Sequence, residues 1–442
     1  MSERDLPGPR SREIFAREQR HIAPGLQSFA LYAGLAMARG RGAMLIDEDG
    51  REYIDFTAGI AVGSVGHCHP HYVEALKRQV EQLTFGSFTT ETRARFLELL
   101  ASITPAGLTR IQLFSGGAEA VEAALRLAKS ATGKYEVLSF WGGFHGKTGG
   151  VLGLLGSDFK HHLGPFLPGQ YSSPYADCYR CPLRLRYPEC GIACAEYVRD
   201  VIKYQTAGDI AAIIVEPIQG TAGNIIPPDG FLRAIRSIAK DHGALLIGDE
   251  MITGFGRTGA MWGSDHEGVI PDVMTVGKGI GGGFPMSGVI STEALTASKP
   301  WSNPSASSSS YGGNPLAAAA GLAALEILVR EDLVRNAKRV GAVMLRRLEA
   351  LRERYECVGE VRGRGLLLGI ELVKDRKSRE PLGKDVTRAL YQECLRRGLV
   401  AMSYAPTIRI NPPLIIGEDT ALAGLEILDE ALGVVVREHG LR

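Results

Sequence analysis

The sequence lacks the features that mark secreted, membrane-spanning or nucleic-acid-binding proteins. Lys and Arg number 50 against 49 Asp and Glu, so the net charge is +1 and no overall positive field favours nucleic acid or an anionic membrane. The longest small-apolar stretch, 316–329, contains Glu326 and is too short to span a bilayer, so it predicts a buried helix. The N-terminal MSERDLPGPR carries acidic residues and no apolar core, which argues against a signal or transit peptide and favours the cytoplasm.

Cysteine is also scarce, but four of the seven cysteines are clustered. These four are Cys178, Cys181, Cys190 and Cys194. They form a Cys-x2-Cys pair and a Cys-x3-Cys pair, with eight residues between the two pairs. Without a secretory signal, such cysteines are expected as thiols or metal ligands rather than disulfides. The spacing predicts a zinc site or an iron-sulfur cluster that staples an insertion at 174–195, with four reduced thiols as the alternative. The interleaved arginines also permit a nucleic-acid knuckle, which the near-zero charge disfavours.

The pattern along the chain predicts two lobes, as its length of 442 residues suggests. From about Tyr72 onward, helical segments alternate with apolar strands, which is typical of a doubly wound, mostly parallel sheet. After the helix at 316–329 a charged helix and short strands indicate a smaller α+β lobe. The predicted parts are an N-terminal arm and hairpin at 1–60, a large domain at 61–330 and a small domain at 331–442.

Two residues suggest a chemistry when they are taken together. Lys278 follows an apolar strand and is flanked by glycines, so its amine and the backbone behind it can approach a flat cofactor ring, as a Schiff-base lysine must. Asp249 ends the apolar run ALLIGD, so its carboxylate would emerge at the sheet edge where open α/β folds bind ligands. Alone, such a lysine is more often a solvated loop residue and such an aspartate a helix N-cap. Together they predict a cofactor with a pyridine ring, which Lys278 holds and whose nitrogen Asp249 keeps protonated.

The segment from Asp249 to Gly283, including TGFGRTG at 253–259, resembles the class III, or omega, aminotransferases. The resemblance extends from about Tyr53 to Pro412. It implies pyridoxal 5'-phosphate as cofactor and a fold-type I α/β architecture, in which helices wrap a mostly parallel sheet and the N-terminal hairpin joins a smaller α+β domain. It also implies a homodimer, with a tetramer as the alternative, and no nucleic-acid or membrane partner.

Several loops then acquire expected cofactor roles. The sequence FSGGAEAVE precedes an Ala-rich helix whose first N–H groups can cradle a phosphate, although a simple capping turn is the plain alternative. The resemblance assigns the phosphate to Gly117 and Ala118, completed by Ser310 of the partner subunit. It places the ring of Phe144, in FHGKT, on the pyridine face. Ile252 takes a position often filled by a Gln that touches the cofactor's phenolic oxygen.

Substrate roles are expected from the same comparison. Lys147 replaces an arginine that in some relatives holds a second carboxylate, and lysine lacks the bidentate fork. Glu216 opens EPIQGTAG at the presumed active edge, where Thr221 replaces a second Glu that screens a C-terminal arginine in many relatives. Arg409 matches that arginine and is therefore expected to grip a substrate carboxylate or sulfonate.

The expected activity is transfer of an amino group from an omega-amino acid or primary amine to a 2-oxo acid. The donor would be similar to GABA, beta-alanine or taurine, and the acceptor pyruvate or 2-oxoglutarate, with pyruvate slightly favoured. Decarboxylases and amino-acid racemases of the same fold remain alternatives, because Lys278 and Asp249 serve all of them. A metal-bearing binding protein without activity is the alternative from another class.

Overall fold

The computed structural model describes residues 6–156 and 158–441 of the chain. The chain divides into two compact units, one formed by residues 1–70 and 335–442 and the other by residues 71–334. Sequence analysis placed the corresponding boundaries at 60/61 and 330/331. Among the described residues, no helix combines the length and the apolar character that crossing a membrane requires.

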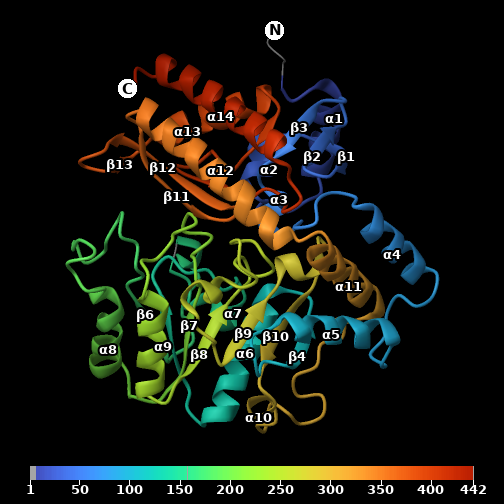
Figure 1. Ribbon diagram of the computed structural model, residues 1–442, viewed down its shortest axis with the longest axis vertical. Helices are drawn as coiled ribbons and strands as arrows, with labels where there is room; N and C mark the ends of the chain where they lie inside the picture. The colour runs from blue at the N-terminus through green and yellow to red at the C-terminus, as the bar shows by residue number, and fades with distance from the viewer. Residues whose placement is uncertain (1–5, 157, 442) are drawn as a thin grey trace. The chain divides into compact units, whose positions relative to one another are not determined.

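The unit 71–334 is built on a seven-stranded sheet (Figure 1). Its strands, in spatial order, are β4 (Arg110–Phe114), β10 (Ser287–Ser291), β9 (Val273–Val276), β8 (Leu245–Asp249), β7 (Ile210–Val215), β5 (Glu136–Phe140) and β6 (Gln170–Ser173). From β9 to β6 all neighbours are parallel, and β10 runs antiparallel to both β9 and β4. The predicted mostly parallel sheet is therefore present.

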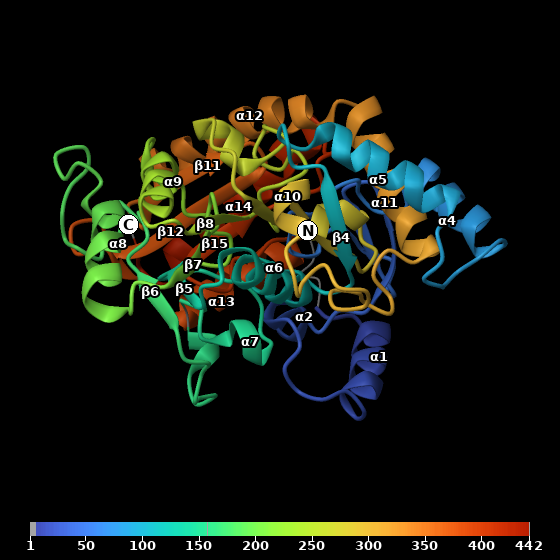
Figure 2. The same cartoon turned by 90° about the horizontal axis from the view of Figure 1, so that it is seen from below.

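Helices cover both faces of this sheet. The described helices in this part of the chain are α4 (Pro70–Val80), α5 (Glu91–Ile103), α6 (Gly117–Thr132), α7 (Gly149–Leu152), α8 (Ala193–Gln205), α9 (Phe231–Asp241), α10 (Glu293–Thr296) and α11 (Pro315–Arg330), with 3-10 turns η1 (Asp158–Lys160), η2 (Gly263–Glu267) and η3 (Lys278–Gly281). The helix predicted at 316–329 is α11, and most of its residues are buried. Figure 2 shows α9 and α6 on opposite sides of β7 and β8.

Alternate residues of the central strands feed two separate cores. Leu138 and Ile213 pack with α8 and α9, whereas Val137, Ala212 and Ile214 pack with α6. Side chains of a strand point alternately to its two faces, so a sheet covered on both sides needs apolar residues at every position. That requirement explains why β7, buried at every position, is a continuous apolar run, whereas β5 is equally buried but includes Glu136 and Ser139.

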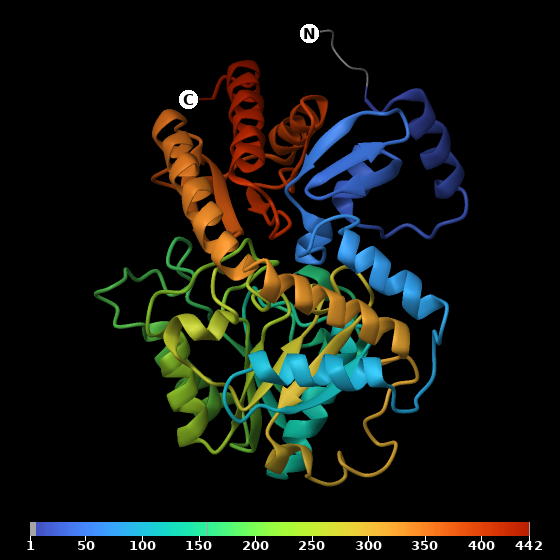
Figure 3. The same cartoon turned by 45° about the vertical axis from the view of Figure 1, so that its right-hand side comes forward.

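The other unit contains two small sheets (Figure 3). The first is β1 (Met37–Arg41), β2 (Met44–Asp47), β3 (Glu52–Asp55) and β14 (Leu399–Val400), and the second joins β11 (Val358–Arg364), β12 (Leu367–Asp375), β13 (Glu380–Pro381) and β15 (Thr407–Ile410). The helices are α1 (Pro9–Gln19), α2 (Ser28–Ala33), the single turn α3 (Ala58–Ala61), α12 (Leu333–Arg354), α13 (Lys384–Arg396) and α14 (Glu418–Glu438). The predicted hairpin is β2–β3, and its pairing with β14 ties the N-terminal segment to the C-terminal one.

The first helix is fixed to the hairpin by a side chain that caps it from a distance. The carboxylate of Asp49 accepts hydrogen bonds from the backbone N–H groups of Arg10 and Ser11, both at 2.9 Å. The first N–H groups of a helix have no acceptor within it, so an acid there stabilises both the helix and its position. The hairpin turn therefore also serves as the docking point of α1.

An aromatic cluster on the α9 side of the sheet should dominate the stability of its unit. Phe231 is fully buried, with ring centroids 5.0 Å from Tyr175 and 5.8 Å from Phe140. We expect Phe231→Ala to lower the free energy of unfolding by about 3–5 kcal/mol, because a cavity replaces a buried ring. Urea denaturation measures this change. Tyr204→Ala is the control, since that side chain is 72% exposed, and equal shifts for both variants would contradict the assignment.

Candidate active site

The residues expected to act in chemistry gather at the carboxyl ends of adjacent parallel strands. Phe144 and His145 follow β5, Glu216 follows β7, Asp249 ends β8 and Lys278 follows β9. Parallel strands bring their carboxyl ends to one edge of the sheet, where ligands of open α/β folds bind. The topology therefore assembles at one edge residues that are widely separated in sequence.

Lys278 occupies a strained position in this arrangement. It begins η3 with φ 44°, in the left-handed region that non-glycine residues rarely adopt. Such strain persists only where the surrounding structure enforces it, and it is concentrated at functional sites. The preceding Gly277 packs closely against Met251, since a Cβ added at Gly277 would lie 2.5 Å from Sδ of Met251.

Asp249 is held by a histidine that the sequence analysis had not singled out. Nδ1 of His145 lies 2.7 Å from Oδ2 of Asp249, and each side chain is only 1% exposed. The other carboxylate oxygen accepts the N–H of Met251 at 3.1 Å. Burial alone would lower the pKa of His145, but the carboxylate of Asp249, with a contribution from Glu216, raises that pKa above its usual value. This buried contact therefore fixes the orientation of the Asp249 carboxylate.

Glu216 lies in the same buried region and is bonded to two loops. Its carboxylate accepts the N–H of Phe144 at 2.8 Å and the N–H of Gly220 at 3.0 Å. Burial raises the pKa of Glu216 to about 7, with the charge of Asp249 adding to the rise and that of His145 opposing it. The predicted role of Glu216 in substrate binding stays a prediction.

The start of α6 has the form of an anion cradle. The carboxylate of Glu119 accepts the N–H groups of Ser115 and Gly116, at 3.1 and 2.8 Å. The N–H groups of Gly117 and Ala118 then head the helix, where no acceptor of the helix itself can reach them. A helix N-terminus with such N–H groups favours a phosphate.

The cradle and the loop that carries Phe144 are in close contact. A Cβ added at Gly146 would lie 2.5 Å from Cβ of Ala118, and the φ of Gly146 is +120°. Only glycine fits this position, both for its backbone angle and for the space available. The segments predicted to bind the phosphate and to stack on the cofactor ring are thus adjacent.

Lys147 lies over aromatic rings. Its Nζ is 4.2 Å from the ring centroid of Phe159 and 5.8 Å from that of Phe144, and the two rings meet edge-on with centroids 5.7 Å apart. Attraction between the ammonium group of Lys147 and the ring faces holds the positive charge beside Phe144, the ring that is expected to stack on the cofactor. Its predicted contact with substrate stays a prediction.

The remaining predicted site residues are placed as follows. Ile252 is buried and packs on the turn after Glu216, since a Cβ added at Gly220 would lie 2.7 Å from Cδ1 of Ile252. Ser310 lies in the segment before α11, and Arg409 lies on β15 of the other unit, opposite Gly369 of β12. Their roles toward phosphate and substrate stay predictions.

Comparison with known proteins places this site in a family. Residues 30–432 match the family model of the class III aminotransferases. The chain belongs to the class III aminotransferase family. It is 35% identical to the leucine/methionine racemase of Thermococcus litoralis, over 96% of both chains. It is also 39% identical to the acetylornithine aminotransferase of Methanopyrus kandleri, over 90% of this chain and 94% of that one.

A solved structure agrees with this assignment. It is the amine transaminase of an uncultivated Pseudomonas species with pyridoxal 5'-phosphate (PLP) bound. The two chains superpose with a TM-score of 0.88 and are 31% identical, over 94% of this chain and 98% of that one. The predicted fold-type I architecture of this class III aminotransferase is thereby confirmed.

Pyridoxal 5'-phosphate, the cofactor that the family implies, fits the residues of this site. The N–H groups at the start of α6 suit its phosphate, the buried Asp249 suits a protonated ring nitrogen, and Lys278 suits its aldehyde. Phe144, beside the cradle, supplies a flat apolar surface for the ring.

The predicted metal site at the cysteines is not supported. Cys178, Cys181, Cys190 and Cys194 line one small cavity of about 20 Å³. Within residues 6–156 and 158–441, however, no group of three or more His, Cys, Asp or Glu side chains could hold a metal ion. Burial and the neighbouring thiols raise the pKa of Cys178 to about 11. Sequence spacing alone did not reveal where these side chains point.

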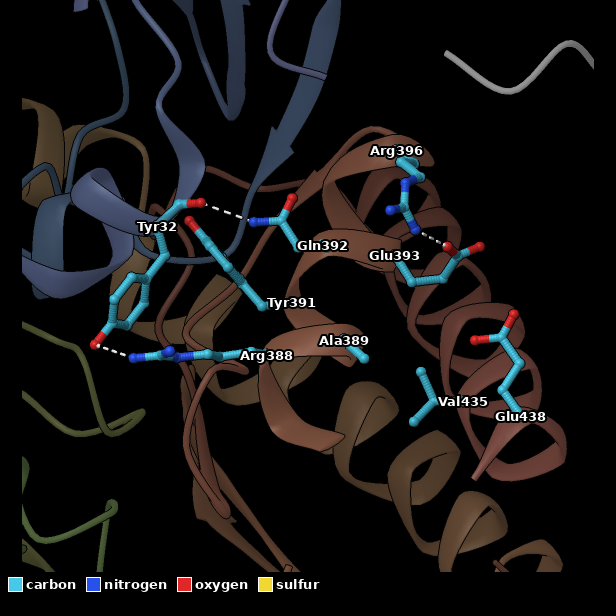
Figure 4. Close-up of a pocket in the computed structure, with 9 residues that line it drawn as sticks. All are labelled: Tyr32, Arg388, Ala389, Tyr391, Gln392, Glu393, Arg396, Val435 and Glu438. Carbon is cyan, nitrogen blue, oxygen red and sulfur yellow. Dashed lines mark hydrogen bonds and ion pairs between the residues drawn. The ribbon is translucent and has the colours of Figure 1, made fainter. Parts of the chain in front are cut away.

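A larger cavity of about 390 Å³ belongs to the other unit (Figure 4). Arg388 and Gln392 of α13 reach across it to Tyr32 of α2, with hydrogen bonds of 3.2 Å to the hydroxyl and 2.7 Å to the carbonyl. Its lining residues include none of those predicted to act in chemistry. We interpret it as the seam where α2 packs on α13.

Glu119 should matter for cofactor binding although it touches no predicted cofactor atom. We expect Glu119→Ala to weaken pyridoxal phosphate binding about fivefold, equivalent to about 1 kcal/mol, because two loop N–H groups lose their acceptor. Equilibrium dialysis measures the affinity. Glu119→Gln keeps one acceptor oxygen and should bind nearly as well as the wild type. Unchanged affinity in the alanine variant would show that the cradle does not depend on this side chain.

Proposed function

We propose that this enzyme moves an amino group from an omega-amino acid or primary amine to a 2-oxo acid such as pyruvate or 2-oxoglutarate. One observation carries the proposal. Lys278, on its strained turn, and the buried Asp249 lie at the carboxyl ends of two neighbouring parallel strands, β9 and β8. Membership of the class III aminotransferases supports the reaction type.

Each residue has a definite task in this reaction. Pyridoxal phosphate, when bound, supplies an aldehyde that combines with amines and a cationic ring that withdraws electrons from the adjacent carbon. Lys278 supplies the amine that retains the cofactor and, once displaced, the base that moves a proton at the substrate carbon. Asp249 keeps the ring nitrogen protonated, and its bonds to His145 and to the N–H of Met251 prevent it from turning away.

The choice of amino donor is inferred from loop positions at which this chain differs from the residues usual in the family. Lysine at position 147 disfavours a pocket that grips a second carboxylate with a bidentate fork. Thr221 stands where many relatives carry a Glu that pairs with the arginine matched by Arg409, and by that resemblance we assign Arg409 to an acidic group of the substrate. We therefore propose donors similar to GABA, beta-alanine or taurine, or plain amines, with pyruvate as the preferred acceptor.

A second candidate is racemisation, and one observation favours it. The racemase of Thermococcus litoralis is similar to this chain over nearly its whole length. Racemisation removes and returns a proton at the same carbon, so the same lysine and aspartate suffice and no acceptor is needed. Decarboxylation is a weaker alternative, and a binding protein without activity is disfavoured because Lys278 and Asp249 are both in place.

Amino-donor assays test the proposal directly. The loaded enzyme should form alanine or glutamate from pyruvate or 2-oxoglutarate with one class of omega-donor, and Lys278→Ala should reduce the rate by more than about 100-fold because the base is lost. Thermal denaturation of the variant checks that it still folds. Loss of optical activity from single amino acids without an acceptor, and no transfer from any donor, would favour the racemase instead.

We further propose that the enzyme is a homodimer in which Ser310 completes the phosphate cradle of the partner. Large apolar side chains on the loop after α4 and beside Ser310 support an interface, since Phe85 is 75%, Phe88 89% and Tyr311 71% exposed.

Introducing a charge into this surface should separate the subunits. We expect Phe88→Glu to shift the mass measured by light scattering toward that of a single chain and to weaken cofactor retention, because a buried carboxylate is costly at an interface. Tyr204→Glu, at a position 72% exposed on α8, should leave the assembly unchanged. A wild-type chain that is monomeric at micromolar concentration would refute the dimer, whereas a tetramer sensitive to Phe88→Glu would extend it.

A further inference from the structure

The turn that begins with Lys278 is bonded to a tyrosine from a distant segment. The hydroxyl of Tyr72, in the first turn of α4, donates a hydrogen bond of 2.6 Å to the carbonyl oxygen of Gly281, the last residue of η3. The backbone N–H of Phe284 donates to the same oxygen at 3.0 Å. Tyr72 and Gly281 are 209 positions apart in the chain, so only the fold brings this donor to the turn.

The turn needs such support from outside. Lys278 has φ 44°, and a non-glycine residue keeps a backbone angle of this kind only where the surrounding structure enforces it. Within the turn, the N–H of Gly282 donates to the carbonyl of Gly279 at 3.3 Å, which is longer than the bond from Tyr72. The tyrosine therefore makes the shorter of these two contacts, and it does so three residues after the lysine.

The hydroxyl of Tyr72 is a permanent donor. Burial raises the pKa of Tyr72 to about 12, with the backbone N–H of Phe284 opposing the rise. The phenol therefore keeps its proton throughout the neutral range. The bond to Gly281 does not depend on pH there.

The start of α4 is itself anchored to a neighbouring helix. Nε2 of His71 lies 2.6 Å from Oε2 of Glu326 on α11, and the guanidinium of Arg95 on α5 lies 3.4 Å from Oε1 of the same carboxylate. Glu326 is the acidic residue within the otherwise apolar helix at 316–329, and its side chain is 15% exposed. Because Tyr72 follows His71 directly, this contact also limits the movement of Tyr72.

We propose that Tyr72 is a positioning residue, which through its bond to Gly281 holds the turn in the geometry that Lys278 needs to act on the cofactor. The inference rests on the proposed function for the role of the lysine. It adds a residue of α4 that acts through the backbone of η3, supported by the contact between His71 and Glu326.

Hydrogen exchange in the apoenzyme tests the bond itself. Peptides covering residues 277–284 should exchange their amide hydrogens about threefold to tenfold faster in Tyr72→Phe than in the wild type, because loss of one hydrogen bond favours local opening. Mass spectrometry measures the exchange. Tyr391→Phe is the matched control, since the hydroxyl of Tyr391 also donates at 2.6 Å to a backbone carbonyl, that of Phe29 in the other unit. This control should leave exchange at 277–284 unchanged.

Cofactor attachment and kinetics separate positioning from a merely structural role. Pyridoxal phosphate should join Lys278 about threefold to tenfold more slowly in Tyr72→Phe. Timed borohydride reduction, which fixes the cofactor to the lysine, followed by mass spectrometry measures this rate. The kcat of amino transfer should fall by a similar factor with KM within about twofold of wild type, because the amine is displaced and the substrate contacts are not. Tyr391→Phe should match the wild type in both measurements.

Two variants of Glu326 test the anchor of α4. Glu326→Ala removes the acceptor of His71 and should raise exchange at 277–284, though by less than Tyr72→Phe does. Glu326→Gln keeps one oxygen toward His71 and should restore most of the protection. Thermal denaturation checks that both variants fold. Exchange in Glu326→Ala equal to that of the wild type would overturn the part assigned to the anchor.

The possible results distinguish this inference from the proposed function. Equal exchange at 277–284 in Tyr72→Phe and wild type would overturn the inference, and so would faster exchange with unchanged cofactor attachment. A wild type that attaches pyridoxal phosphate but transfers no amino group would refute the proposed function, and the attachment rates would still decide the role of Tyr72.

Discussion

The site depends on the buried contact between His145 and Asp249, at 2.7 Å. An isolated carboxylate at the end of a fully buried strand would tend to take up a proton, and a neutral acid could not keep a pyridine ring cationic. The imidazole supplies the compensating charge from the loop after β5, which β7 separates from β8 in the sheet. The pair therefore couples the chemistry of the site to the register of the sheet, because any slip between these strands would separate the two side chains.

The remaining polar contacts at the edge depend on this pair. Glu216 holds the backbone of the residue before His145, and Met251, which donates its N–H to Asp249, also packs against Gly117 at the start of α6. The carboxylate, the ring-stacking loop and the phosphate cradle are thus linked through short contacts. Preorganisation of this kind removes the need to reorder the site when the cofactor binds.

Sequence reasoning identified the parts of this site but not the bonds between them. The alternation of apolar strands and helices predicted the parallel sheet, and the strand-end positions of Asp249 and Lys278 followed from it. His145 was visible inside the FHGKT motif, but which carboxylate it meets depends on strand order, which a single sequence does not give. The cysteine spacing was equally visible, yet ligand geometry depends on side-chain directions in an irregular loop. Likewise, the docking of α1 depends on Asp49, a residue whose hairpin context suggested only a turn.

The close approach of Gly146 to Ala118 restricts how this scaffold can diversify. Because a Cβ added at Gly146 would lie only 2.5 Å from that of Ala118, the loop that carries Phe144 cannot approach the start of α6 any further without displacing it. A side chain at Gly146 would push the two segments apart, so this position is closed to every residue except glycine.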